Sequence, residues 1–536
     1  MKKIKLNLLD SGKKNFSNKK LNYVFLFLSI FIVGAFFRLY HLGTDILWVD
    51  EPFSTFFSQK PLLDILKYIS VDSNPPLYYI LLHFWIKLFG DSLFIIRLFS
   101  VAVGLIDLLL FYFIIKKLFG KQIAFISYTI LALSPYFIFY SRLARTFPLL
   151  LLFTLLSYWC FNRFFINKSE NIFHALGFVF FSTLAVYTHY YAIFFLLAIS
   201  TGYILWSFIK SYRKLWAKFL FSLLAIFLLF SAWLPFFLIK WLEQKNGHWS
   251  SMSSRSVFDI FDILFIKSIF LEFNMASFFD RIILIILIIV IIFLFVNFWN
   301  KNKKRIISDD NLLFLFIILL LLVIFFLIYS NNITPRYIIY FLIVYLPLLS
   351  MVIIYQKKAF RNLPLLFIIG LCLLNINKAI SYNNSEFFYK WKPLVENINH
   401  LQKENDCIFV HEPHFTYYYK YYNRRSIEPL EILPVDVYKD KYFSCDPNID
   451  RDYYRSKWLG YNYWLNQSIY NELSDSLDSK FSSCQRIWLI YYAPHDNYGL
   501  IPFYFNTNFG KPITREYFDK RFQVSLYNNK NYQSNK

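Results

Sequence analysis

The chain has 536 residues, of which 57% are hydrophobic, and it carries a net charge of +22. A composition this apolar excludes an ordinary soluble enzyme and is typical of a protein that crosses a membrane several times. The positive charge does not indicate a nucleic-acid partner, because it falls in short clusters between apolar runs, where it is expected to set membrane topology.

The chain begins with a polar tail, residues 1–20, that contains seven lysines. No cleavage-site pattern precedes the first apolar run, so we interpret that run as an uncleaved signal-anchor. Eleven uniformly apolar runs approach or reach the length of a membrane-spanning helix. They are 21–40, 97–115, 122–140, 146–162, 172–187, 190–209, 217–239, 280–299, 311–329, 337–355 and 363–377.

Charge placement predicts the topology. Clusters of Lys and Arg occur at 2–20, 116–121, 163–168, 210–218, 301–305 and 357–361. All fall on one side if 21–40 and 97–115 are consecutive crossings, and the positive-inside rule makes that side cytoplasmic. The stretch 75–90, short and carrying His83 and Lys87, is then an interfacial helix. We predict a bacterial inner-membrane protein with eleven spans, a cytoplasmic N-terminus and an extracytoplasmic C-terminal region; ten to thirteen spans fit the pattern.

With this topology, polar residues next to span ends gather on the outer side. The acidic candidates are Asp50 and Glu51, and the others are Asn74, Arg142, Arg145, His189, Tyr190 and Arg336. Carboxylates held this close to lipid are costly and are therefore functional candidates. A carboxylate accepts a proton from a hydroxyl or amine, and arginines hold phosphate by charge-assisted bonds. The pattern predicts a polar, electropositive cavity at the membrane boundary.

Each candidate also has a structural interpretation. Asp50 followed by Pro52 is typical of a helix start, and Pro75-Pro76 predicts another, capped by Asn74 or Ser73. The arginines fit anchors at the membrane interface, and His189 fits a hydrogen-bonded structural histidine. No metal ligands are predicted; the sequence names no cofactor and leaves a divalent metal open.

Several segments occur together in order: "LWVDEPFS", "DSNPPLYYILLHFWIKLFGDSLFIIRLFSVAVG", "LALSPYFIFYSRLARTFPLLLL", "YTHYYAIFFLLA", "WLPFFL" and "TPRYIIYFLIVYLP". Over roughly residues 20–360 this set resembles the bacterial polyprenyl-phosphate-sugar glycosyltransferases of the GT-C type. These are relatives of the protein O-mannosyltransferases and the lipid A aminoarabinose transferases.

The resemblance implies an outward-facing active site in the first outer loop, flanked by juxtamembrane helices. It implies that Asp50 activates the acceptor, with Glu51 beside it, and that a single displacement inverts the anomeric carbon. Two departures bear on donor contacts. Asn74 stands where relatives often have His or Lys, and the residues after Arg145 differ from the usual Tyr or acidic residue. Arg142, Arg145 or Arg336 would then supply the charge that meets the donor phosphate.

From about residue 381 the composition changes, which predicts an extracytoplasmic α/β domain over 381–536 after a transmembrane domain over 21–380. Strands are expected at "CIFVHEP", "RIWLIYY" and "RFQVSLY", and a helix at "EFFYKWKPLVENINHLQKEN". The Tyr-rich "HFTYYYKYYNRR" is interpreted as a packed strand and turn, with stacking on sugars as the alternative. One disulfide is expected among Cys407, Cys445 and Cys484, without a defined pairing.

The leading hypothesis is a membrane glycosyltransferase that takes a sugar from a polyprenyl phosphate. The acceptor is a protein, a lipid or an envelope glycan, and membrane lipids are the other partners. A transporter or flippase of lipid-linked sugars would bury charges in mid-span and show repeated halves, which the sequence lacks. A polymerase is disfavoured by the acidic pair in the first loop, and a non-enzymatic scaffold leaves the outer arginines unexplained.

Overall fold

The protein is described by a computed structural model. It covers residues 22–43, 47–48, 50–70, 74–239, 262–270, 300, 302, 304–328, 335–355, 362–381, 391–410, 419–420, 422–423, 477, 481, 483–492, 500–519 and 522–529. The chain divides into two compact units. The larger unit comprises Met1–Thr44, Phe57–Trp241 and Ser251–Tyr382, and the second comprises Asp45–Phe56, Leu242–Ser250 and Asn383–Lys536.

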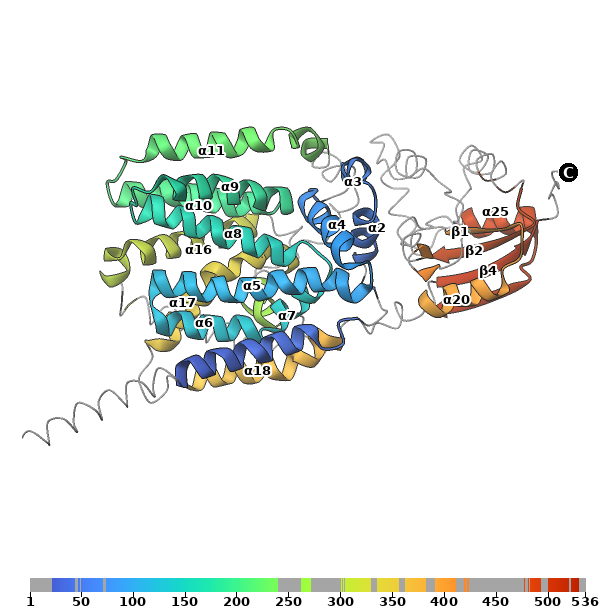
Figure 1. Cartoon of the computed structure of the whole chain (residues 1–536), viewed down its shortest axis with the longest axis horizontal. Coiled ribbons are helices and arrows are strands. Elements are labelled where there is room, and N and C mark those ends of the chain that lie inside the picture. The colour runs from blue at the N-terminus through green and yellow to red at the C-terminus, as the bar shows by residue number, and fades with distance from the viewer. Residues whose placement is uncertain are drawn as a thin grey trace, which may run out of the picture. The chain divides into compact units, whose positions relative to one another are not determined.

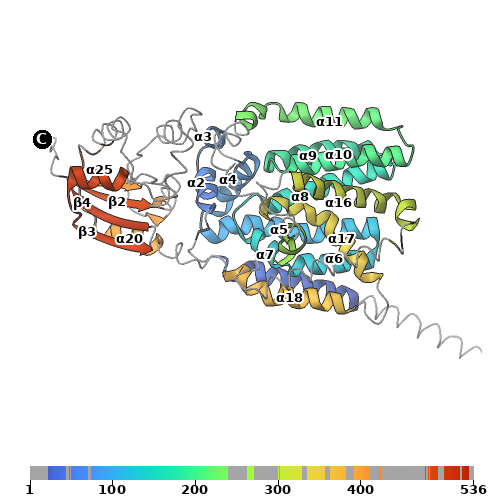
Figure 2. The same cartoon turned by 180° about the vertical axis from the view of Figure 1, so that it is seen from behind.

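The larger unit is a bundle of helices with roughly parallel axes (Figure 1). The described helices that build the predicted spans follow in chain order. They are the helix Asn22–Leu39, α5 (Leu93–Phe119), α6 (Lys121–Leu133), α7 (Pro135–Arg142), α8 (Phe147–Phe161), the π-helix η1 (Asn162–Ile166), α9 (Ile172–Thr188), α10 (Ala192–Ile209), α11 (Trp216–Phe230), α16 (Asp310–Ile328), the 3-10 helix η5 (Pro335–Phe341), α17 (Leu342–Ile354) and α18 (Asn362–Ser381). In both views α11 lies at one edge and α18 at the opposite edge (Figures 1 and 2).

Helices thus occupy ten of the eleven predicted spans, while the predicted span 280–299 lies outside the described residues. By length and composition, six described helices can each cross a membrane, and the bent pair α6–α7 makes a seventh. The chain is therefore a multi-pass helical membrane protein, as its composition predicts. The count of eleven spans stays a prediction.

Shorter helices connect the first long helix to α5. The described ones are α2 (Glu51–Ser58), α3 (Leu62–Ile69) and α4 (Leu77–Phe89). With 13 residues, α4 is about 20 Å long and does not match the ~30 Å hydrocarbon core of a bilayer. It starts after Pro75-Pro76 as predicted, but its N-cap residue is Pro76 and no side chain caps it. The predicted cap at Asn74 is therefore wrong, and Ser73 lies outside the described residues.

Basic side chains gather at one end of the bundle, here called the basic end. Lys121, at the start of α6, lies 3.5 Å from the ring centroid of Tyr23, at the start of the first helix. Arg163, just after α8, lies over the ring of Trp159. Lys210, after α10, forms a 2.9 Å ion pair with Asp310 at the start of α16. The described Lys and Arg residues of the clusters predicted to be cytoplasmic thus lie at the same end of the bundle.

The second unit contains a four-stranded sheet in the order β1-β2-β4-β3. β1 (Asp406–Val410) is parallel to β2 (Arg486–Tyr492), and β4 (Phe522–Asn528) is antiparallel to both β2 and β3 (Thr514–Asp519). Helices α20 (Trp391–Leu401) and α25 (Leu500–Phe509) flank the sheet (Figure 1). Consecutive residues of β2, including Ile487 and Trp488, are buried, which requires cover on both faces.

The predicted α/β composition is confirmed, with two elements that the sequence pattern missed, β3 and α25. A disulfide joins Cys407 in β1 to Cys484, just before β2. In the Tyr-rich segment, Tyr419, Lys420 and Tyr422 are helical, so the predicted strand is wrong at the described residues. Tyr419 is fully buried and Tyr422 nearly so, which agrees with a packing role.

Candidate active site

A broken span places two of the predicted arginines. Helices α6 and α7 meet at a bend of 57°, and Ser134 sits at the break. Its Oγ accepts from the N–H of Phe137, which caps α7, and donates to the carbonyl of Ile269 at 2.6 Å. A Cβ on Gly104 of α5 would lie 2.8 Å from Cβ of Ser141, so glycine there permits the close approach of α5 and α7. The chain then leaves α7 directly at Arg142.

Arg142 binds main-chain carbonyls. Its Nη1 donates to the carbonyl oxygens of Phe37 at 2.8 Å, Arg38 at 3.2 Å and Tyr40 at 2.6 Å. Phe37 and Arg38 lie in the last turn of the first long helix, where carbonyls have no partner within the helix, and Tyr40 follows that helix directly. The predicted substrate-binding residue Arg142 therefore closes the C-terminal end of that helix, with a side chain that is only 8% exposed.

Arg145, His189 and Arg336 form an electrostatic cluster at the opposite end from the basic end. Arg145 precedes α8, His189 follows α9, and Arg336 lies in η5. Nη1 of Arg145 donates to the hydroxyl of Tyr79 at 3.5 Å. Burial, and after it the charges of Arg145 and Arg336, lowers the pKa of His189 to about 3. The cluster therefore holds two cations around a neutral imidazole.

The hydrogen bonds of His189 define its tautomer. Its Nδ1 accepts from the N–H of Tyr191 at 3.2 Å, so the proton of the neutral ring is on Nε2. The ring lies 5.1 Å from that of Tyr337, which is also stacked on Tyr191 at 4.5 Å. Arg336 lies over the same Tyr337 ring and donates to its hydroxyl at 3.1 Å. Tyr337, which was not among the predicted site residues, thus joins the histidine to the arginine.

Two further predicted residues lie in this unit. Tyr190 accepts a hydrogen bond from Nε1 of Trp233 at 2.9 Å, so its hydroxyl ties α10 to the chain after α11. Asn74 is 7% exposed and lies just before α4. Tyr78 in α4 shares a 2.9 Å hydrogen bond with Ser100, whose Oγ donates to the main-chain carbonyl of Arg145. Helix α4 is thereby tied to the arginine cluster.

Asp50 and Glu51 belong to the second unit and differ from each other. Glu51 is fully buried, and its Oε2 accepts from the N–H of Trp48 at 2.8 Å. The N–H of Glu51 in turn donates to the carbonyl of Trp48 at 2.9 Å, so the two residues close a turn just before α2. Asp50 is partly exposed. The predicted helix start is confirmed, since α2 begins at Glu51.

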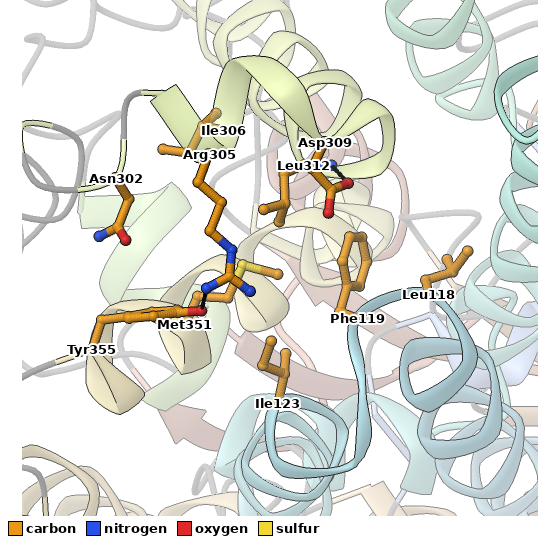
Figure 3. Close-up of a pocket in the computed structure, with 10 residues that line it drawn as sticks. All are labelled: Leu118, Phe119, Ile123, Asn302, Arg305, Ile306, Asp309, Leu312, Met351 and Tyr355. Atoms are coloured by element: carbon orange, nitrogen blue, oxygen red, sulfur yellow. Dashed lines mark hydrogen bonds between the residues drawn. The ribbon is translucent and has the colours of Figure 1, made fainter.

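A cavity of about 100 Å³ lies at the basic end (Figure 3). Arg305 donates to the hydroxyl of Tyr355 across it, and Asp309 accepts from the N–H of Leu312 at 3.1 Å, capping α16. None of the eight predicted site residues, all of which the structure describes, lines this cavity. We therefore place the candidate active site elsewhere.

The sequence analysis missed two ionisable side chains buried inside the bundle. Arg38 and Asp107 are both fully buried and interact electrostatically. Nη1 of Arg38 donates to the carbonyls of Gly34 and Ala132 at 2.9 and 3.0 Å. The signal was present as single charges within the apolar runs 21–40 and 97–115, where an ionisable residue is rare.

Metal ligands are a separate question. Within the described residues, no group of three or more His, Cys, Asp or Glu side chains is placed to hold a metal ion.

Known proteins resemble this chain in part of the sequence and in fold. The family model of dolichyl-phosphate-mannose-protein mannosyltransferases matches residues 73–236. No curated protein sequence matches the chain. The crystal structure of apo ArnT from Cupriavidus metallidurans shares the fold, with a TM-score of 0.60 and 11% identity, over 95% of this chain and 98% of that one. The same protein bound to undecaprenyl phosphate gives a TM-score of 0.58 and 12% identity over 94% and 98%.

The matched segment contains Asn74, Arg142, Arg145, His189 and Tyr190, but neither Asp50 nor Arg336. The shared fold extends over nearly the whole chain, including the C-terminal unit. The matched family is one of sugar transferases, which favours an enzyme over the flippase and scaffold alternatives. Over residues 73–236 the chain is similar to the dolichyl-phosphate-mannose-protein mannosyltransferases, and over nearly its whole length it shares the fold of ArnT.

Proposed function

We propose that the protein transfers a sugar from a polyprenyl-phosphate donor to an acceptor on the extracytoplasmic side of a bacterial inner membrane. The acceptor is a protein, a lipid or an envelope glycan. The anomeric carbon is inverted, and Asp50 is the base.

The cluster of Arg145, His189 and Arg336 is the observation that carries this proposal. Two guanidinium groups around a neutral histidine suit a phosphate, because arginine gives charge-assisted and often bidentate bonds to phosphate oxygens. Nε2–H of His189 adds a donor that carries no charge. The ArnT structure whose fold this chain shares was solved with undecaprenyl phosphate, which supports a polyprenyl phosphate as the ligand class.

The proposed reaction is one displacement. The carboxylate of Asp50 takes the proton of the acceptor hydroxyl or amine as the acceptor atom bonds to the anomeric carbon. The bond between that carbon and the phosphate oxygen breaks, and its electron pair leaves with the polyprenyl phosphate. Arg145 and Arg336 stabilise the charge that the phosphate gains. No second nucleophilic carboxylate is needed, since inversion takes a single step.

Two observations support the proposed orientation. The described basic clusters share one end of the bundle, which the positive-inside rule assigns to the cytoplasm. The disulfide between Cys407 and Cys484 suits an oxidising compartment outside the cytoplasm.

Mass spectrometry of lipid-linked sugars and envelope glycans in a deletion strain tests the function. The proposal expects an accumulated polyprenyl-phosphate sugar and the loss of one glycan modification, both reversed by the wild-type gene. An unchanged pool of lipid-linked sugars together with unchanged glycans would contradict it.

A further inference from the structure

The segment that carries Asp50 is held by the C-terminal part of the chain. Residues Asp45–Phe56 belong to the same compact unit as Asn383–Lys536. Within that unit the N–H of Leu47 donates to the hydroxyl of Tyr422 at 3.2 Å, across 375 positions of sequence. Leu47 is fully buried and Tyr422 is 9% exposed, so the bond is shielded from water.

A second contact lies on the other side of the acidic pair. Nζ of Lys420 is 5.5 Å from the ring centroid of Phe56, within the range of a cation–π interaction. Leu47 precedes Asp50 and Phe56 follows it. The two contacts therefore bracket the proposed base.

Both contacts come from one helical turn. The N–H of Asn423 donates to the carbonyl of Tyr419 at 2.8 Å, which closes the turn that contains Lys420 and Tyr422. Tyr419, the first residue of this turn, is fully buried. Because Tyr419 anchors the turn, Lys420 and Tyr422 are held at a fixed distance from each other. They can therefore support the segment that runs from Leu47 to Phe56.

We propose that the turn 419–423 is a positioning element for the transfer reaction, with Tyr422 and Lys420 as positioning residues that hold the segment 47–56 and so orient Asp50. This inference rests on the proposed function. The residues after 383 then contribute to catalysis by holding Asp50 in place, and they need no reactive group of their own. Small errors in the placement of a base are costly in rate, so such a support affects turnover more than donor binding.

The test compares two Tyr→Phe variants of the full-length protein. Tyr422→Phe removes the hydroxyl that accepts from Leu47. Tyr419→Phe is the matched control, because the hydroxyl of Tyr419 has no hydrogen-bond partner within the described residues. Hydrogen–deuterium exchange of a peptide covering residues 43–56 reports the anchoring. Steady-state kinetics with the lipid-linked donor accumulated in the deletion strain, and with that strain's envelope fraction as the source of unmodified acceptor, report its effect.

We expect Tyr422→Phe to speed exchange in that peptide about threefold to tenfold and to lower kcat about tenfold, with the donor KM within about twofold. Tyr419→Phe should change neither quantity. Lys420→Met should behave like a weaker Tyr422→Phe, and Lys420→Arg, which keeps a cation over Phe56, should restore the wild-type values.

Equal exchange in Tyr422→Phe and wild type would overturn the anchoring. Faster exchange with an unchanged kcat would overturn the positioning role. The exchange experiment uses the protein alone, so it separates two failures. A wild-type protein that discharges no lipid-linked donor overturns the proposed function and the catalytic meaning of the turn, whereas equal exchange overturns the turn's hold on the segment.

Discussion

Glu51 is fixed by the main chain of Trp48, whose N–H donates to its Oε2 at 2.8 Å in a fully buried setting. Its neighbour Asp50 is partly exposed. Adjacent carboxylates thus have different surroundings. Glu51 stabilises the start of α2, and Asp50 is the better candidate for a group that must reach an acceptor.

Replacing Arg145 should weaken donor binding. Arg145→Ala removes a charge-assisted contact to the proposed phosphate, so we expect the donor KM to rise about tenfold or more. Binding of undecaprenyl phosphate to the purified protein provides a second measurement. Arg213→Ala is the control, because Arg213 is an exposed arginine between α10 and α11, over the rings of Phe208 and Trp216. Equal effects of the two variants would contradict a specific phosphate contact.

His189 should make stability depend on pH. Its pKa is lowered from 6.5 to about 3 in the folded protein, chiefly by burial, so between these values the unfolded state binds the proton and the folded state does not. The stabilisation is complete above pH 6.5 and declines as the pH falls toward 3. From pH 7.5 to 5.5 wild type should lose about 1–2 kcal/mol more than His189→Asn, measured by thermal unfolding. Parallel pH curves would show that the histidine is not buried as a neutral group.

The buried side chains of Arg38 and Asp107 should depend on each other. Asp107→Leu removes the group with which Arg38 interacts electrostatically, and we expect a coupling energy of about 0.5–3 kcal/mol between the two positions. The double variant Arg38→Met, Asp107→Leu should lose less than the sum of the two single changes. A double-mutant cycle on thermal stability measures this, and strictly additive effects would mean that the two side chains are not coupled.

The disulfide should stabilise the C-terminal unit. Cys407→Ser or Cys484→Ser opens a bridge between residues 77 positions apart, and we expect a loss of about 2–4 kcal/mol together with faster proteolysis of the chain after residue 383. Cys445→Ser is the control and should be neutral. If Cys445→Ser were the damaging change, a different pairing would be present.

The apolar runs of the sequence predicted most helices of the bundle, because a membrane-spanning helix is recognised from its own length and hydrophobicity, whatever the rest of the chain does. The sequence also predicted that Arg145, His189 and Arg336 face the same end, because positive charges mark the other end. It could not predict which arginine binds main-chain carbonyls. Arg142 and Arg145 are three residues apart, and only the 57° break before α7 turns Arg142 to the end of the first helix.

The contact between Leu47 and Tyr422 was beyond sequence reasoning for a different reason. It joins residues 375 positions apart through a main-chain donor, which leaves no pattern in the sequence. At the described residues of the Tyr-rich segment the strand was mispredicted because aromatic residues favour strands on average, and tertiary packing of Tyr419 overrides that preference.

The most direct test of the central claim uses the lipid-linked donor accumulated in a deletion strain. Purified wild-type protein and Asp50→Asn, matched for membrane insertion and thermal stability, are incubated with this donor and with the envelope fraction of the deletion strain, which carries the unmodified acceptor. Release of polyprenyl phosphate is followed by mass spectrometry. If Asp50 is the base, the wild type releases polyprenyl phosphate and Asp50→Asn does so about 10²–10⁴ times more slowly. Release by Asp50→Asn at the wild-type rate would contradict the account.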